Sequence, residues 1–393
     1  MPEVNISRRV KRHIWAPEHE LALVVKPGLE ELAVQELVGL GMREVVAQQG
    51  VVVFRARLEG LYRVLLMSRV GGRVLLRLKR VRLRAWRDAV QAAEAVAWEC
   101  ICPPGGRVRV EVVVRSGRLA HPRHMAELVE KAIVQRMRAV GLEPPVSGAG
   151  REEAELVVIL RVEGHHATLS VDTTGPHMHK RGYRLEPGPA PLREDLAAAL
   201  LKLADYEGQW PVLEGMCGAG TIAIEAAMMA RGLPPGAERS FAIHRWPCHR
   251  PRMWDHLRTK ALESALEAPP KPIIARDRDP EAIEIAIANA ARAGLVGQLR
   301  FSQADFFTAP PPFQPPALVV LDPPYGPRLA SASRARALAE RIGRRLKQAY
   351  QGWRCAVVVP EIEWVELMGL SRQKTLVVPH GGRRVVLAAG WVD

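Results

Sequence analysis

The feature that most constrains the fold is a short apolar run, residues 317–321, that stops at Asp322-Pro323-Pro324-Tyr325. The two prolines fix φ and lack amide donors, so the chain can neither continue as a strand nor enter a regular helix there. The pattern predicts a buried strand ending at a rigid turn that presents a carboxylate, backbone carbonyls and an aromatic ring. Open α/β sheets bind ligands at that end of their strands. We expect a site for a planar base with an exocyclic amine; an ordinary turn is the alternative.

An earlier strand, residues 211–213, leads into a glycine-rich turn at 214–221 and then an apolar helix at 222–229. Glycines at such a turn let the backbone approach a ligand at the helix N-terminus. Taken alone, this turn could serve a dinucleotide, a nucleoside or only a tight connection.

Two further strands end at aspartates, and their order sharpens the interpretation. The second strand is followed by Asp277 and by Asp279-Pro280, and the third ends at Asp305. An acid at the end of the second strand is where a ribose diol is held, and we assign Asp277 to that role. Asp279 is interpreted as a helix cap, because Pro280 follows it. Asp305 is expected to accept from an adenine amino group. The remaining elements expected in this half are helices at 192–203, 281–293 and 334–350 and strands at 272–275, 300–305, 355–359, 374–378 and 384–388.

The N-terminal part has the periodicity of smaller α+β units. Strands are expected at 21–25, 45–46 and 51–54 and helices at 29–40 and 58–67, a β-α-β-β-α order typical of a ferredoxin-like unit. A second unit is expected from strands at 73–84, 108–115, 156–160 and 167–171 with a helix at 121–140.

A row of basic residues marks the strand at 73–84. Arg80, Arg82 and Arg84 alternate with apolar residues, which places them on one face of a strand. No acidic residue intervenes before Asp88, so a surface that follows phosphates is favoured over a merely solvated face.

The overall balance of charge supports a polyanionic partner. The 393 residues carry a formal net charge of +14, which favours nucleic acid first and an anionic membrane second. No leading signal and no apolar segment of membrane-spanning length is evident, so we expect a cytoplasmic protein without a membrane partner. The five cysteines are scattered, and we expect neither a disulfide framework nor a metal site.

The chain also resembles a known family. The turn at 214–221, Asp277, Asp305 and the motif at 322–325 are similar, in order, to the motifs of Rossmann-like S-adenosylmethionine-dependent methyltransferases. Residues 169–175, 179–184 and 190–194 resemble the join between a THUMP domain and its methyltransferase, and residues 26–32 resemble the family's first helix. The resemblance covers nearly the whole chain and is strongest to RlmL-type guanine-N2 methyltransferases of 23S ribosomal RNA. The tRNA guanine-N2 methyltransferases of the TrmN type are next.

The resemblance implies an α/β fold with four parts: a basic arm and ferredoxin-like unit at 1–70, a THUMP RNA-binding domain at 71–175, a linker at 176–190 and a Rossmann-like catalytic domain at 191–393. S-adenosylmethionine is the implied cofactor and structured RNA the implied partner, with no obligate protein partner. The residues implied to hold the cofactor are Glu214, Met216, Gly218, Gly220, Thr221, Asp277 and Asp305. Those implied in catalysis are Asp322, Pro323, Pro324 and Tyr325, and those expected to contact RNA are Arg80, Arg82, Arg84, Lys180, Arg181 and Arg184.

Two departures from the family pattern stand out. The family usually has Asp-Pro before Met-Cys-Gly, where this chain has Glu214-Gly215, and close relatives often carry Asn where this chain has Asp322. Three other functions stay open: guanine methylation of tRNA, adenine-N6 methylation, and a non-catalytic RNA-binding or assembly protein.

Overall fold

The computed structural model describes residues 5–116, 121–184, 192–324 and 332–393. Tyr325, the last residue of the predicted catalytic motif, lies outside these ranges. The chain divides into two compact units. The first comprises Met1–Val25, Ala33–Met178 and Arg239–Arg258, and the second comprises Lys26–Leu32, His179–Glu238 and Thr259–Asp393.

The first unit is built on one sheet of seven strands in the order β2-β3-β1-β4-β7-β6-β5. The strands are β1 (His19–Val24), β2 (Arg43–Gln48), β3 (Val51–Ala56), β4 (Arg73–Arg82), β5 (Val108–Ser116), β6 (Leu156–Glu163) and β7 (His166–Asp172). The helices are α1 (Ile6–Val10), α2 (Glu30–Gly39), α3 (Leu58–Met67), α4 (Trp86–Glu94) and α5 (Pro122–Ala139). The predicted β-α-β-β-α order is confirmed. Helix α4, whose buried residues are the small side chains Ala89 and Ala93, was not predicted.

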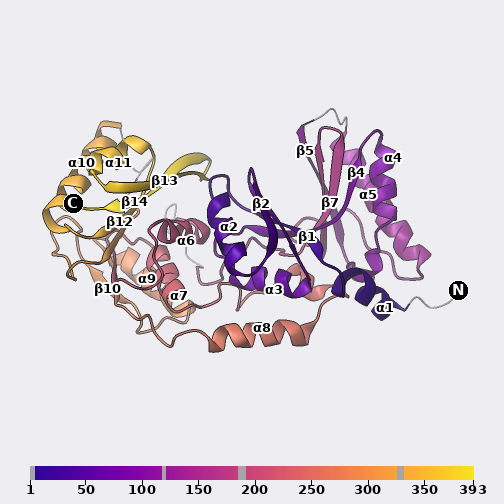
Figure 1. Ribbon diagram of the computed structural model, residues 1–393, viewed down its shortest axis with the longest axis horizontal. Helices are drawn as coiled ribbons and strands as arrows, with labels where there is room; N and C mark the ends of the chain where they lie inside the picture. Colours follow the sequence, from indigo (N-terminus) through magenta and orange to yellow (C-terminus); the bar gives the residue numbers. More distant parts are fainter. Residues whose placement is uncertain (1–4, 117–120, 185–191, 325–331) are drawn as a thin grey trace. The chain divides into compact units, whose positions relative to one another are not determined.

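Strand β4 joins the two N-terminal parts that the sequence suggested. Its first half pairs with β1, from Arg73 to Leu76, and its later residues pair with β7, from Leu75 to Arg82. The predicted boundary after residue 70 therefore falls just before a strand that both parts share. In Figure 1, β4 and β7 lie side by side near α4 and α5.

Residues 239–258 belong to this first unit although they follow the glycine-rich turn in sequence. The Trp15 indole N–H donates to the Cys248 carbonyl at 2.8 Å, and the Tyr62 hydroxyl lies 2.8 Å from His249 Nδ1. The Trp246 indole N–H donates to the Glu155 carbonyl at 3.1 Å. No periodicity in the sequence indicated that this segment leaves the unit to which its neighbours in sequence belong.

The second unit contains a seven-stranded sheet in the order β10-β9-β8-β11-β12-β14-β13. Its strands are β8 (Val212–Glu214), β9 (Ile273–Asp277), β10 (Arg300–Gln303), β11 (Leu318–Leu321), β12 (Arg354–Val359), β13 (Ser371–His380) and β14 (Arg383–Trp391). Strands β8 to β12 run parallel, whereas β14 is antiparallel to both β12 and β13. The predicted α/β class is confirmed.

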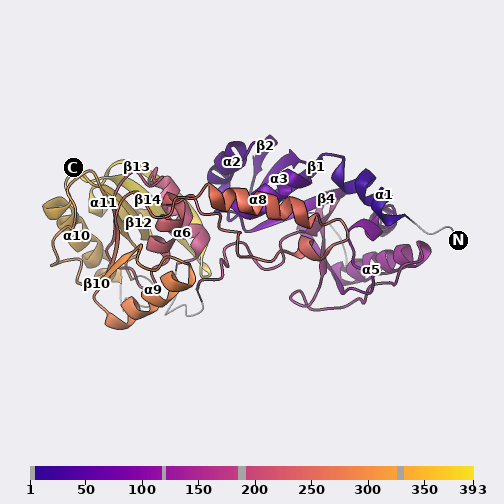
Figure 2. The same ribbon diagram turned by 90° about the horizontal axis from the view of Figure 1, so that it is seen from below.

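Helices cover both faces of this sheet. They are α6 (Glu194–Leu203), α7 (Thr221–Ala230), α9 (Pro280–Arg292), α10 (Ala332–Ala349) and α11 (Ile362–Met368). Helix α8 (Pro251–Glu263) comes between α7 and β9 in the sequence, and its residues up to Arg258 belong to the first unit. Figures 1 and 2 show α10 and α11 together on one side of β12 and β14, and α6 on the other. The core between α10, α11 and the sheet includes Val319, Leu321, Ile342, Leu346, Trp353, Val357 and Trp364.

Helices α6 and α7 are almost entirely buried, which explains why most of their residues are apolar. The acids Glu194, Asp195 and Glu225 are buried with them. Each of the two helices has 10 residues, whereas a membrane span needs about 20. Across the described ranges, no helix is both long and apolar enough to cross a membrane.

Candidate active site

The candidate site lies where the order of the second sheet changes direction. From β8 the chain proceeds outward through β9 to β10, then returns to β11 on the other side of β8 and continues to β12. Ligands of open α/β sheets bind at such a switch point, beyond the carboxyl ends of the strands. Strands β8, β9, β10 and β11 are parallel, so their carboxyl ends lie at one edge of the sheet. Glu214 and Asp277 are the last residues of β8 and β9, and Asp305 and Asp322 come just after β10 and β11.

Two glycines of the glycine-rich turn differ in the space beside them: Gly220 is packed against α9, whereas Gly218 has no neighbouring atoms on its Cβ side. Both Gly218 and Gly220 have positive φ, +49° and +75°, a conformation that side chains disfavour. A Cβ on Gly220 would lie 2.9 Å from Ala286 Cβ, so this glycine allows α7 to pack against α9. A Cβ on Gly218 would meet no atom within 4 Å. The backbone at Gly218 is therefore open to a ligand at the N-terminus of α7.

Glu214 is buried beneath this turn, with 1% of its surface exposed. The Ala223 N–H donates to Glu214 Oε2 at 2.9 Å, so the carboxylate caps the start of α7. Burial raises the pKa of Glu214 well above its usual range, and the nearby Asp322 charge adds to that shift. Glu214 therefore has a structural role that the sequence did not reveal, and its contact with the cofactor stays a prediction.

The neighbouring Gly215 explains one departure from the family pattern. Its N–H donates to the Val320 carbonyl at 3.0 Å, and a Cβ here would lie 2.7 Å from Phe306 Cδ2 and 2.9 Å from Leu321 Cδ2. A proline would lose the N–H and would collide with both side chains. In this chain, packing therefore requires glycine at position 215.

Asp277 links the second strand to the turn. The Gly218 N–H donates to Asp277 Oδ2 at 2.9 Å, and the Asp279 N–H donates to Oδ1 at 3.1 Å. Asp279 accepts from the Glu281 N–H at 3.0 Å with Pro280 opening α9, so the predicted cap is confirmed. A carboxylate has about four acceptor positions, which leaves Asp277 capacity for a ribose diol.

The remaining members of the predicted site follow β10 and β11. Asp305 Oδ1 accepts from the Phe307 N–H at 2.8 Å, which shapes the loop after β10. Asp322 is half-buried directly after Leu321, and Pro323 behind it is buried. Met216 is partly buried against the core, and Thr221 is the first residue of α7.

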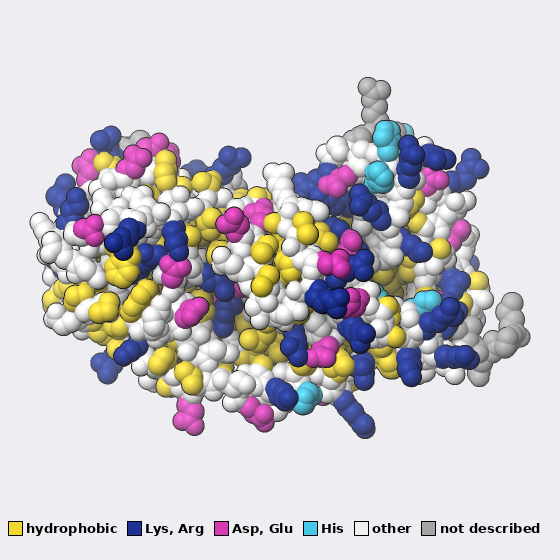
Figure 3. Space-filling view, in the orientation of Figure 1, with side chains coloured by type: hydrophobic (Ala, Val, Ile, Leu, Met, Phe, Trp, Pro, Cys, Tyr) yellow, Lys and Arg dark blue, Asp and Glu magenta, His cyan; other side chains and the backbone are white. Residues whose placement is uncertain are grey.

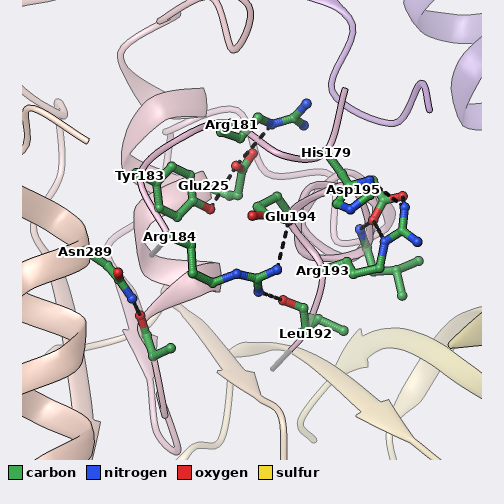
Figure 4. A network of polar contacts seen from close by, with 12 residues as sticks. His179, Arg181, Tyr183, Arg184, Leu192, Arg193, Glu194, Asp195, Glu225 and Asn289 are labelled. Carbon is green, nitrogen blue, oxygen red and sulfur yellow. Dashed lines mark hydrogen bonds and ion pairs between the residues drawn. The ribbon is translucent and has the colours of Figure 1, made fainter. Parts of the chain in front are cut away.

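The predicted RNA contacts of the linker are wrong for Arg181 and Arg184. Arg181 is 5% exposed and pairs with the buried Glu225 of α7 at 3.5 Å. Arg184 donates to the Leu192 carbonyl at 2.7 Å and to Glu194 Oε2 at 3.2 Å (Figure 4). These arginines hold the linker to α6 and α7 and are therefore structural.

The same network includes further side chains that the sequence did not single out. The Tyr183 hydroxyl donates to Glu225 Oε1 at 3.2 Å, and Arg193 bridges His179 and Asp195 (Figure 4). Burial raises the pKa of Glu194 to about 7, although the Arg184 charge opposes that shift. A buried acid cannot be recognised from a sequence in which it opens an ordinary amphipathic-looking segment.

In contrast to Arg181 and Arg184, the row of basic residues predicted to contact RNA on the strand at 73–84 is exposed to solvent. Arg80, Arg82 and Arg84 are all exposed, and Lys180 of the linker is exposed as well. Arg80 pairs with Thr168 and Arg82 with His166 across the β4–β7 ladder. Figure 3 shows Lys and Arg side chains gathered over the region of β4, β5 and α5.

An aromatic cluster that was not predicted lies close in sequence to this row. The Trp86 ring lies 5.0 Å from the His124 ring and 6.1 Å from the His121 ring, measured between centroids. The signal that could have revealed it is a tryptophan among arginines, Arg82 to Arg87, since aromatic residues within basic stretches are typical of surfaces that bind single-stranded nucleic acid.

Comparisons with known proteins agree with this arrangement. Residues 181–385 match the family model described as the RMKL-like methyltransferase domain, and residues 20–75 match the RlmL ferredoxin-like domain. The ribosomal RNA large subunit methyltransferase K/L of Ectopseudomonas mendocina is 35% identical over 370 residues, which is 91% of this chain and 50% of that protein. The chain thus spans about half the length of this relative.

Two solved structures are similar over almost the full chain. A predicted N6-adenine-specific DNA methylase from Listeria monocytogenes has a TM-score of 0.84 and 27% identity, covering 96% of this chain and 97% of that one. The structure of SMU.472, named as a methyltransferase and complexed with SAH, has a TM-score of 0.85 and 24% identity, covering 96% and 98%. The latter likeness establishes the fold.

Proposed function

This chain belongs to the RMKL-like methyltransferase family, and we propose that it transfers a methyl group from S-adenosylmethionine to the exocyclic N2 amine of a guanosine in large-subunit ribosomal RNA. The observation that carries this proposal is the convergence of Gly218, Asp277, Asp305 and Asp322 at one edge of the sheet, beside the switch point. The resemblance to RlmL-type enzymes seen in the sequence is confirmed by both family matches.

The residues present fit the cofactor. The open backbone at Gly218 suits the methionine part at the N-terminus of α7, together with Met216 and Gly220. Asp277 retains acceptor positions that would hold the ribose, and Asp305, which follows the next strand outward, would accept from the adenine amino group. When bound, S-adenosylmethionine supplies a methyl group activated on a sulfonium.

The guanine N2 amine is a poor nucleophile because its lone pair is delocalised into the ring. Asp322 and the Pro323 carbonyl accept the two amine hydrogens and so turn the lone pair toward the methyl group. Pro324 keeps these acceptors rigid, and Tyr325 stacks on the flipped base. Positioning for in-line transfer provides most of the rate enhancement. Asp322 also takes up the released proton, which an asparagine cannot do.

The RNA is held by its backbone through the exposed basic residues Arg80, Arg82, Arg84 and Lys180. The net charge of +14 supports a polyanionic substrate. The THUMP-like part, residues 71–175, favours RNA over DNA. A ribosomal rather than a transfer RNA is favoured by the relatives' names.

Methyl transfer from labelled S-adenosylmethionine to separate pools of unmodified ribosomal RNA and tRNA tests this proposal. We expect label as N2-methylguanosine in large-subunit ribosomal RNA. The same nucleoside in tRNA alone would change the substrate, and N6-methyladenosine would contradict the guanine assignment; the name of the Listeria structure makes the adenine outcome worth measuring. Cofactor binding without transfer to any pool would favour a non-catalytic RNA-binding protein.

A paired substitution tests the role of Asp322. Asp322→Ala should abolish detectable turnover and leave cofactor affinity within a few-fold of wild type. Glu361, an exposed carboxylate after the neighbouring strand β12, provides the matched control, and Glu361→Ala should retain turnover. A loss of cofactor affinity as large as the loss of rate would contradict the assigned role of Asp322.

A further inference from the structure

Helix α10, which follows the Asp322 motif, is unusually basic. From residue 334 to its end it carries six basic side chains and one acid, Glu340. Its buried side, with Ala339, Ile342 and Leu346, packs in the core. The opposite side exposes Arg334, Arg336, Arg341, Arg344 and Lys347. Lys and Arg side chains are visible over α10 in Figure 3.

This charge distribution opposes the stability of the helix itself. The first turn of α10 contains no acid, and Arg334 and Arg336 near its start face the positive end of the helix dipole. Like charges three or four residues apart, Arg341 with Arg344 and Arg344 with Lys347, repel one another on the helix surface. The ion pair of Arg336 with Glu340, at 3.1 Å, offsets part of this repulsion.

The helix is also anchored to the candidate site. Arg345 donates to the Phe306 and Ala309 carbonyls, at 3.2 and 2.5 Å. The Arg341 guanidinium carbon lies 3.7 Å from the centroid of the Phe307 ring. Phe307 in turn donates its N–H to Asp305. The loop that presents Asp305 and the basic helix are therefore one packed structure.

The topology sets the direction of this helix relative to the site. Because α10 connects the parallel neighbours β11 and β12, it starts at the edge where Asp322 lies and ends at the opposite edge. Arg334 to Arg344 span ten residues, or about 15 Å along the axis. A nucleic acid strand that delivers a base to Asp322 could place several phosphates along that length.

We infer that the exposed face of α10, at Arg334, Arg341 and Arg344, is a phosphate-contacting strip that guides the RNA strand carrying the target base. This inference rests on the proposed function and adds a second RNA surface, in the catalytic unit. A polyanion along the strip relieves the repulsion within the helix. Binding of a polyanion also explains why basic residues occupy the start of α10, where a solvated helix would carry acids.

The test compares two charge-matched double variants. Arg334→Gln/Arg344→Gln removes two charges from the strip, and Lys260→Gln/Lys271→Gln removes two exposed charges elsewhere in the same unit. The measurement is the salt dependence of binding to protein-free, unmodified large-subunit ribosomal RNA. In the strip variant we expect the slope of log K against log salt to fall by about 1.4 to 1.8, from about 0.7 to 0.9 per phosphate contact. The control slope should stay at the wild-type value.

Equal slopes in the two double variants would overturn the inference, whether or not they differ from the wild-type slope. The strip residues would then affect RNA binding no more than other exposed charges of the same unit. In the strip variant, the affinity for S-adenosylmethionine and the thermal midpoint measured without RNA should not fall. A lower midpoint would show that the double variant is misfolded. The single variant Arg344→Gln would then test the inference, with half the expected change in slope. Because RNA binding is measured without turnover, a change in slope with no N2-methylguanosine product would uphold the strip and reject the proposed reaction.

Discussion

Two groups of arginines look alike in the sequence and have opposite environments in the structure. Arg80, Arg82 and Arg84 are exposed at and just after β4, whereas Arg181 is buried and Arg184 is nearly so. Both groups lie in basic stretches of the sequence, and the first acids after them are Asp88 and Glu186. The difference comes from Glu194 and Glu225, which approach the second group from α6 and α7. A basic stretch therefore indicates a surface only when no acid elsewhere in the chain folds onto it.

The largest effect that would test this comparison is on stability. Arg181→Met leaves the carboxylate of Glu225 buried without its cation, so the free energy of unfolding should fall by about 3 to 5 kcal/mol. Denaturant unfolding measures this loss. Arg80→Met is the control and should change the free energy of unfolding by less than about 0.5 kcal/mol. If both substitutions cost the same, the contrast between the two groups is wrong.

The next largest effect is expected in the pH dependence of stability, which should change when Glu194, the acidic partner of Arg184, is replaced but not when an exposed arginine is replaced. The folded pKa of Glu194 is about 7, above its usual 4.5, so the folded state binds more protons between these values. Stability must therefore decrease as pH rises from about 4.5 to 7, and the loss is complete above that window. Relative to wild type, Glu194→Gln should gain about 2 to 3 kcal/mol in free energy of unfolding between pH 5 and pH 8.

Unfolding of both proteins across this pH range checks the shift. Arg80→Gln is the control, and its profile should run parallel to wild type, since arginine does not titrate there. A constant difference between wild type and Glu194→Gln at every pH would mean that Glu194 titrates normally.

RNA binding should depend on the exposed arginines at and just after β4, in contrast to stability, which should depend on the buried Arg181. Substituting glutamine for Arg80, Arg82 and Arg84 together should reduce the salt slope of RNA binding by about 2 to 3, because three phosphate contacts are lost. The free energy of unfolding should hardly change. Filter binding at several salt concentrations measures the slope, and an unchanged slope would remove β4 from the RNA surface.

The smallest effect is expected at Lys180, the exposed basic residue next to buried Arg181. Lys180→Gln should lower the salt slope by about 0.7 to 0.9 and leave stability unchanged. Comparing it with Arg181→Met in the same assays isolates burial as the variable. A loss of stability at Lys180 similar to that at Arg181 would contradict the assignment of these neighbours to surface and interior.

Local patterns in the sequence were sufficient for most of the fold. The apolar run ending at Asp322-Pro323 predicted a buried strand and its stop, and Asp279-Pro280 predicted a helix start that the structure confirms. Helices α4 and α8 were missed because each buries few side chains: Ala89 and Ala93 are the buried residues of α4, and Trp254 is the buried residue of α8.

The sequence by itself determined the order of the strands, the positions of the acids at the strand ends and the excess of positive charge, because each depends on residues close together in the chain. The tertiary structure decided which charges are buried. It also decided that Gly215 must stay glycine beside Phe306 and that residues 239–258 belong to the N-terminal unit. These outcomes depend on partners that are dozens of residues away, and no local periodicity encodes which distant side chain or backbone will meet a given residue.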